Sequence, residues 1–178
     1  MNIYTGDCND LVDDIVGRIK QNDSISLNLA FLDPEGFELR WTTVARLATV
    51  RRMDLIINYP QGGLNRYMRQ AYQTEAQTPI DLFFGGREWR KRYKEWQDGR
   101  TRLGLHRLLI DLYKDKLKGL GYTEVFRGDE VIEEEPLIRN TKRAPLYRLL
   151  FASKHPLGHD FWHKVTRRDV YGQTLLPL

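Results

Sequence analysis

Two short apolar runs, each followed by a polar residue, a proline and a glycine, stand out along the chain. They occupy residues 24–36 (SISLNLAFLDPEG) and 53–63 (MDLIINYPQGG). Each run is too short for a helix and long enough for a buried strand. In an open α/β sheet, ligands bind beyond the carboxyl ends of parallel strands. The pattern therefore predicts that Asp33-Pro34 and Asn58 are neighbours at a functional edge of a sheet.

Apolar residues at helical spacing surround these two strands. The spacing predicts one helix over residues 11–20, before the first run, and another over residues 41–50, between the runs. Ile3 and Tyr4 indicate the end of a further strand, with Gly6-Asp7 as the turn after it. Strands that alternate with helices are typical of a mostly parallel sheet.

The second half of the chain has a different character. Residues 64–122 are polar and mostly helical in pattern, which predicts a helical insertion within a single domain of residues 1–178. Strand-like residues at 123–126, 131–132 and 146–153 predict an antiparallel hairpin at one edge of the sheet. A last helix is predicted over residues 158–168, with Phe161, Trp162 and Val165 facing inward.

The overall composition restricts the class of protein. The chain has 178 residues, a net charge of +4 and one cysteine, Cys8, so an internal disulfide framework is excluded. No apolar run approaches the roughly 20 residues that a membrane span needs, and the first residues lack the layout of a signal peptide. We therefore expect a cytoplasmic protein without a membrane partner. The mild positive charge allows nucleic acid as a partner without arguing for it.

One segment mixes basic and aromatic side chains. The candidates for contacts with single-stranded nucleic acid are Arg87, Trp89, Arg90, Arg92 and Trp96. Phosphate pairing combined with aromatic stacking is how such strands are held without sequence readout. The structural alternative is a solvated helix whose aromatic side chains pack onto the domain, while Glu88 and Glu95 balance its charge. The sequence favours the structural alternative.

Three histidines near the C-terminus recur every four residues. They are His155, His159 and His163, a spacing that places imidazoles on one face of a helix. Pro156 and Gly158 interrupt such a helix, and no cysteine or carboxylate pattern completes a ligand set. We expect no metal site here.

Several ordered motifs resemble the three-Cys-motif partner protein family (TcmP). The motifs are GDCNDL, FLDPEGF, LIINYPQGGLNR, FFGGREW, LIDLYKDKLKGLGY and YRLLFASKHPLGHDFWHKV, and together they cover nearly the whole chain. The family is methyltransferase-like and is named for its pairing with a three-Cys-motif protein of the radical S-adenosylmethionine type. The resemblance implies a partial class I methyltransferase-like, Rossmann-like three-layer α/β sandwich, with S-adenosylmethionine as the cofactor and that protein as a partner.

The resemblance also implies roles for individual residues. Asp7 matches the acid that meets the adenine of S-adenosylmethionine. Asp33 and Pro34 match the motif beside the methyl group and the substrate, which gives Asp33 both a cofactor-binding and a catalytic role. Asn58 is expected at the same edge and is a candidate catalytic residue together with Asp33 and Pro34. Each of these residues is also an ordinary turn former, so a purely local role stays open.

Two departures from the family pattern affect these expectations. A first strand with a glycine-bearing loop and a second strand ending in an acid for the ribose have no counterpart in the chain. We therefore expect an incomplete or inactive methyltransferase-like protein, which binds the cofactor weakly or not at all by itself. The alternative is a non-enzymatic module that binds nucleic acid or protein through the basic helical region.

The missing first strand has a structural consequence. In the methyltransferase sheet that strand lies beside the one we assign to residues 24–32, so this nearly all-apolar strand is left at an edge. Exposed apolar edges pair readily with other chains. We therefore expect the 24–32 edge to be covered by a partner strand, by self-association or by a rearranged segment.

Overall fold

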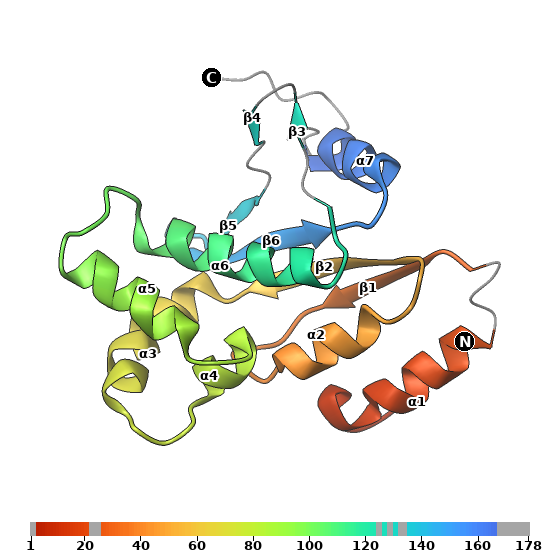
Figure 1. The fold of residues 1–178 in the computed structure, drawn as a ribbon, viewed down its shortest axis with the longest axis horizontal. Helices are drawn as coiled ribbons and strands as arrows, with labels where there is room; N and C mark the ends of the chain where they lie inside the picture. The colour runs from red at the N-terminus through yellow and green to blue at the C-terminus, as the bar shows by residue number, and fades with distance from the viewer. Residues whose placement is uncertain (1–2, 22–25, 124–125, 128–129, 132–134, 167–178) are drawn as a thin grey trace.

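The computed structural model describes residues 3–21, 26–123, 126–127, 130–131 and 135–166. Its main sheet has four strands in the order β1-β2-β6-β5 (Figure 1). These strands are β1 (Asn28–Leu32), β2 (Met53–Tyr59), β6 (Pro145–Ala152) and β5 (Leu137–Arg139). β1 and β2 are parallel, whereas β6 runs antiparallel to both of its neighbours. Two short strands, β3 (Phe126–Arg127) and β4 (Glu130–Val131), form a separate antiparallel pair.

The structure confirms the mixed α/β class, and its four-stranded sheet is mixed. β1, β2 and β5 run in the same direction, and β6 between β2 and β5 runs in the opposite direction. The antiparallel hairpin at one edge is confirmed, but its outer strand is β5 rather than residues 123–132. A tight turn explains this, since the amide of Asn140 donates to the carbonyl of Ala144 and reverses the chain directly into β6.

Some expected strand and helix residues cannot be compared with the structure. Residues 24–25, 124–125, 132 and 167–168 lie outside the described residues. The strand end expected at Ile3 and Tyr4 is wrong, because both residues are exposed and belong to no strand. Neither has a neighbouring strand with which it pairs in the described sheet.

The first two predicted helices are confirmed, and both pack beneath β1 and β2. They are α1 (Cys8–Lys20) and α2 (Trp41–Leu47). The apolar side chains of α1 that the helical spacing aligned, Val12 and Val16, are buried in the same core as Val44 of α2. On the sheet, this core contains Met53, Leu55, Ile57 and Tyr59 of β2 and Leu150 and Ala152 of β6.

The region from residue 64 to residue 122 is helical, as predicted. It contains α3 (Gln61–Gln73), α4 (Pro79–Phe84), α5 (Glu88–Gln97) and α6 (Leu105–Gly119). An aromatic cluster joins these helices to the sheet, because Phe83 lies 5.1 Å from Tyr113 and 6.3 Å from Tyr59, measured between ring centroids. Gly85 ends α4 at φ +66, and a Cβ there would collide with the Trp41 ring. The helices therefore share one core with the sheet.

The opposite face of the sheet carries a single described helix, α7 (Pro156–Thr166). In Figure 1, α7 lies above the sheet, while α1 and α2 lie below it. Trp162 is buried and stacks on Phe151 of β6 at 5.0 Å between ring centroids, as expected for an inward residue. Phe161 and Val165 were expected inward as well and are instead 68% and 47% exposed. α7 packs on β6, and only His159 and Trp162 of the helix are buried there.

The same face is uncovered over β1. Leu27, Leu29 and Phe31 alternate with partly buried residues and are 83%, 61% and 58% exposed. The three-layer arrangement therefore exists only where α7 covers β6, within the described residues. None of the described helices is long and apolar enough to cross a membrane.

Candidate ligand-binding site

The carboxyl ends of β1 and β2 meet, as the sequence predicted. Asp33 follows β1 directly, and Asn58 lies at the end of β2. The amide Nδ2 of Asn58 donates to Oδ1 of Asp33 at 2.5 Å. Asp33 is exposed, and Pro34 beside it is half-buried. The structure thus brings together the three residues for which the sequence indicated a catalytic role.

Asn58 is the buried member of this pair. It is 5% exposed, and its Oδ1 atom is buried without a hydrogen-bond partner in the described part of the chain. A buried acceptor without a partner is unfavourable and is uncommon away from functional or strained positions. The side-chain amide of Asn58 therefore makes a hydrogen bond through its Nδ2, to the Asp33 carboxylate, and none through its Oδ1.

A cleft of about 740 Å³ opens beyond these strand ends. The two segments that follow the strands form much of its wall: the loop after β1 and the start of α3 after β2. The lining residues are Asp7, Glu35, Gly36, Phe37, Glu38, Arg40, Pro60, Gly63, Arg66, Tyr67, Pro79, Leu82, Leu146 and Tyr147. Asp33 and Asn58 do not line the cleft themselves, although they lie two residues before Glu35 and Pro60.

Three carboxylates and two guanidinium groups surround the cleft. The acids are Asp7, Glu35 and Glu38, and the bases are Arg40 and Arg66. Glu38 is partly engaged, because its Oε2 accepts from the backbone amide of Gly36 at 2.7 Å. The cleft therefore offers both signs of charge together with the aromatic surfaces of its wall.

Asp7 has a structural role at the edge of the cleft. Its carboxylate caps α1 by accepting from the backbone amide of Asn9 at 2.8 Å, and it also accepts from the Asn9 side chain at 2.7 Å. These hydrogen bonds lower the pKa of Asp7 below its usual value, first the backbone one and then the side-chain one. Asp7 therefore has a local structural role as the N-cap of α1, and it also lies in the wall of the cleft.

Asn9 ties the cleft wall together, a role that sequence reasoning did not foresee. Its Nδ2 donates to the carbonyl of Glu38 at 2.8 Å. Its Oδ1 accepts from the amide of Arg40 at 2.9 Å and from the hydroxyl of Thr43 at 2.6 Å. One side chain thus fixes the start of α1 against the segment that precedes α2. Such a link between residues about 30 positions apart leaves no periodic signal in the sequence.

A second group of polar side chains joins the end of β2 to α3 and α6, and it was not predicted from the sequence. The Tyr59 hydroxyl lies 3.2 Å from Nδ1 of His106, and Nε2 of His106 lies 2.8 Å from Oδ1 of Asn65. Burial lowers the pKa of His106 to about 4, and the nearby charge of Arg148 contributes. The imidazole is therefore neutral at physiological pH. Arg148 in turn donates to Oε1 of Gln61 at 2.8 Å, which fixes the first turn of α3.

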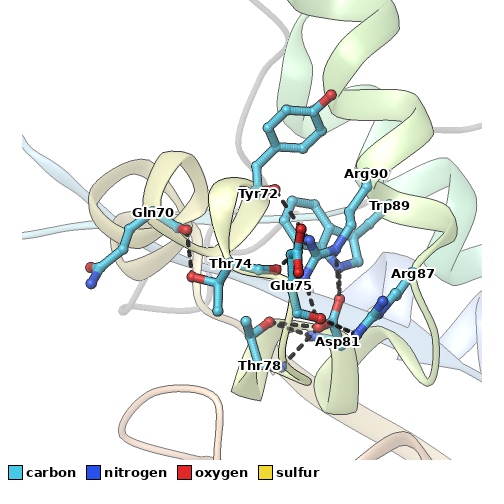
Figure 2. Close-up of polar contacts among 9 residues, drawn as sticks. All are labelled: Gln70, Tyr72, Thr74, Glu75, Thr78, Asp81, Arg87, Trp89 and Arg90. Atoms are coloured by element: carbon cyan, nitrogen blue, oxygen red, sulfur yellow. Dashed lines mark hydrogen bonds and ion pairs between the residues drawn. The ribbon is translucent and has the colours of Figure 1, made fainter.

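Two of the five residues proposed for nucleic-acid contacts are structural. Figure 2 shows Trp89 and Arg90 directed at Asp81 of α4. The indole Nε1 of Trp89, which is fully buried, donates to Asp81 Oδ1 at 2.9 Å. Arg90 forms an ion pair with Asp81 at 2.9 Å and also donates to the carbonyls of Tyr72 and Thr74.

The other three residues of that set lie nearer the surface. Arg87 is exposed and donates to the carbonyl of Glu75, as drawn in Figure 2. Arg92 pairs with Glu95 within α5 at 3.4 Å, and Trp96 is exposed beside Tyr93. The five residues therefore do not form one continuous surface.

The late histidines lie in different surroundings. His155 precedes α7, as expected, whereas His159 is buried with its Nε2 3.2 Å from the Thr123 hydroxyl. Among the described residues, no group of three or more His, Cys, Asp or Glu side chains is placed to hold a metal ion.

Comparisons with protein-family models, with curated proteins and with solved structures found no significant match to this chain.

Proposed function

We propose that this chain is a methyltransferase-like α/β domain of the three-Cys-motif partner type, with its ligand site in the cleft beyond β1 and β2. The observation that carries the proposal is the position of that cleft. It opens where the carboxyl ends of two adjacent parallel strands meet, next to the Asp33–Asn58 pair. Ligands of open α/β sheets bind at this position.

The strand order supports the same proposal. The resemblance to a class I methyltransferase domain implies a final antiparallel hairpin at one edge of the sheet. Here β6 is inserted between β2 and β5 and is antiparallel to both. The described sheet is what the second half of such a sheet would contain.

The cleft suits S-adenosylmethionine in size and charge. A volume of about 740 Å³ lies within the range of roughly 300–1,000 Å³ that is usual for small-molecule sites. The cofactor carries a sulfonium and an ammonium group beside one carboxylate, so it complements a wall with Asp7, Glu35, Arg40 and Arg66. When bound, it supplies the transferable methyl group. The glycine-bearing loop and the ribose-binding acid have no counterpart in this chain, so binding by the chain alone is weak.

Asp33 has a defined role in this proposal. Its carboxylate is exposed at the edge of the sheet and is oriented by Asn58. An exposed, oriented carboxylate there is able to accept a hydrogen bond from a methyl acceptor and hold its nucleophilic atom in place. Catalysis of this kind depends on proximity and orientation. The three-Cys-motif protein that the resemblance implies remains the proposed partner, and the nucleic-acid alternative keeps only Arg87, Arg92 and Trp96 near the surface.

Calorimetry with S-adenosylmethionine at millimolar concentration tests this proposal. We expect weak binding to the natural chain, reduced about threefold to tenfold by Arg40→Ala, because a charge-assisted contact in the cleft is lost. Arg139→Ala is the matched control, since Arg139 is also exposed but lies on β5 outside the cleft. Absence of heat from the natural chain, or equal losses in both variants, would contradict the proposal.

A further inference from the structure

β1 is an edge strand whose outer backbone groups lack a neighbouring strand among the described residues. The amide of Asn28 donates to the carbonyl of Arg52 at 2.9 Å, so Asn28 directs its backbone toward β2. Successive residues of a strand direct their backbone groups to opposite sides. Leu29 and Phe31 therefore direct their N–H and C=O groups to the open edge of the sheet.

The two edges of the sheet differ in their protection. At the opposite edge, β5 is only three residues long, contains Arg139 and has an irregular register between Ile138 and Arg139. Short length, charge and irregularity all discourage pairing with another chain. β1 has the sequence NLAFL, with neither a charge nor a proline, and its five residues pair regularly with β2. Of the two edges of the described four-stranded sheet, the β1 edge is the one suited to accept another strand.

We propose that β1 pairs antiparallel with β1 of a second copy of this chain, which forms a two-fold dimer with a continuous sheet. Leu29 and Phe31 direct their bonds outward, so the hydrogen-bonded pairs of the dimer join these residues. Pairing each Leu29 with Phe31 of the other copy is the register that overlaps all five residues of β1. Ala30 then lies on the two-fold axis opposite its own equivalent, in a pair without hydrogen bonds.

Charge selects the antiparallel direction. Arg51 and Arg52 are exposed next to the beginning of β1, whereas Asp33 and Glu35 are exposed just beyond its end. Antiparallel pairing places the basic end of each copy beside the acidic end of the other. Parallel pairing would bring like charges together and would not close into a symmetric dimer. The same surface is thus complementary to itself only when the strands run in opposite directions.

Side-chain contacts add to this pairing. The two-fold axis of this antiparallel pair is perpendicular to the sheet, so the exposed side chains of both β1 strands lie on the same face. The exposed Leu29 of each copy then contacts the exposed Phe31 of the other. Cross-strand contacts between aromatic and aliphatic side chains stabilise a strand pair. The dimer would partly cover the apolar face that the monomer leaves open over β1.

Sedimentation velocity of the 21.0 kDa chain across a range of concentrations tests this proposal, which is independent of any ligand. We expect a species of twice the monomer mass. Leu29→Pro removes an N–H that points to the open edge, so it should raise the dissociation constant about tenfold or more while the monomer stays folded by circular dichroism. Phe31→Lys should act in the same direction, because a lysine on an edge strand opposes pairing. Leu103→Lys, which changes an exposed leucine before α6, is the matched control and should leave the dimer intact.

Charge exchange provides a second readout. Arg52→Glu should weaken the dimer, and the double variant Arg52→Glu with Glu35→Arg should restore it, because the complementary ends are exchanged. A natural chain that remains monomeric at high concentration would overturn the proposal, and so would a dimer that Leu29→Pro and Phe31→Lys leave unchanged.

Discussion

The two faces of the main sheet differ sharply. On one face, the residues from Met53 to Tyr59 that point toward α1, α2, α4 and α6 are buried in a continuous core. On the other face, α7 covers β6 while Leu29 and Phe31 of β1 stay exposed. The first face accounts for the stability of the fold. The second face and its open edge leave apolar surface exposed over β1.

The largest effect is expected from the charge that is buried on the covered face. Asp81 is 2% exposed, and Asp81→Ala would leave Arg90 without its charged partner. Removing one member of a buried pair destabilises a protein by about 3–5 kcal/mol. Asp13→Ala breaks an exposed pair with Arg46 and should lower the free energy of unfolding by no more than about 1 kcal/mol. Urea denaturation of the two variants measures the difference, and equal losses would contradict the structural role of Asp81.

A leucine from each face gives the next comparison. Leu55→Ala on the covered face should lower the free energy of unfolding by about 2–5 kcal/mol, because it creates a cavity in the core. Leu29→Ala on the open face should change it by no more than about 0.5 kcal/mol at protein concentrations low enough to keep the copies apart. If the two substitutions were equally harmful to the monomer, the second face would be covered in a way that the described structure does not contain.

The pH dependence of stability separates the buried Asp81 from the half-buried His106. Burial raises the pKa of Asp81, but hydrogen bonds from Arg90, Thr78 and Trp89 outweigh it and hold the value at about 2. A carboxyl that titrates near 3.9 when unfolded then stabilises the fold by about 2–3 kcal/mol above that pH. This stability is lost as the pH falls from about 4 to about 2.

His106 affects the stability of the fold at higher pH than Asp81 does. Its folded pKa of about 4 lies below the unfolded value of about 6.5, so the unfolded state binds more protons between these values. Stability should therefore fall as the pH is lowered from about 6.5 to about 4. His106→Gln should remove this slope and leave the decline below pH 4 in place. Denaturation midpoints measured across pH 2–8 provide the test, and an unchanged slope in the variant would show that His106 is not the group responsible.

The apolar pattern in the sequence was sufficient to locate α1, α2, β1 and β2. It failed for the burial of β1, because Leu29 and Phe31 of this apolar run are exposed. It failed for Phe161 and Val165, because helical spacing identifies an apolar stripe without showing how much of it finds a partner. It also failed for β5, whose three residues carry no alternating pattern and are placed by the turn before β6.

In the candidate site, too, local sequence patterns predicted some contacts and did not predict others. The adjacency of Asp33 and Asn58 followed from two strand ends, which is local information combined with one rule about sheets. The link through Asn9 and the clamp between Asp81 and Arg90 depend on contacts between separate elements. Arg90 shows why a basic segment alone was ambiguous, since its charge is used inside the fold rather than on the surface.

The most direct test of the proposed site is a residue-resolved NMR titration of the chain with S-adenosylmethionine. We predict that the largest amide shifts cluster at Asp7, Gly36, Arg40 and Gly63, which surround the cleft. Gly99 and Gly121, which lie in turns outside the cleft, should not move. Shifts scattered over the surface, or absence of shifts at the cleft with millimolar cofactor, would contradict the assignment of this cleft as the ligand site.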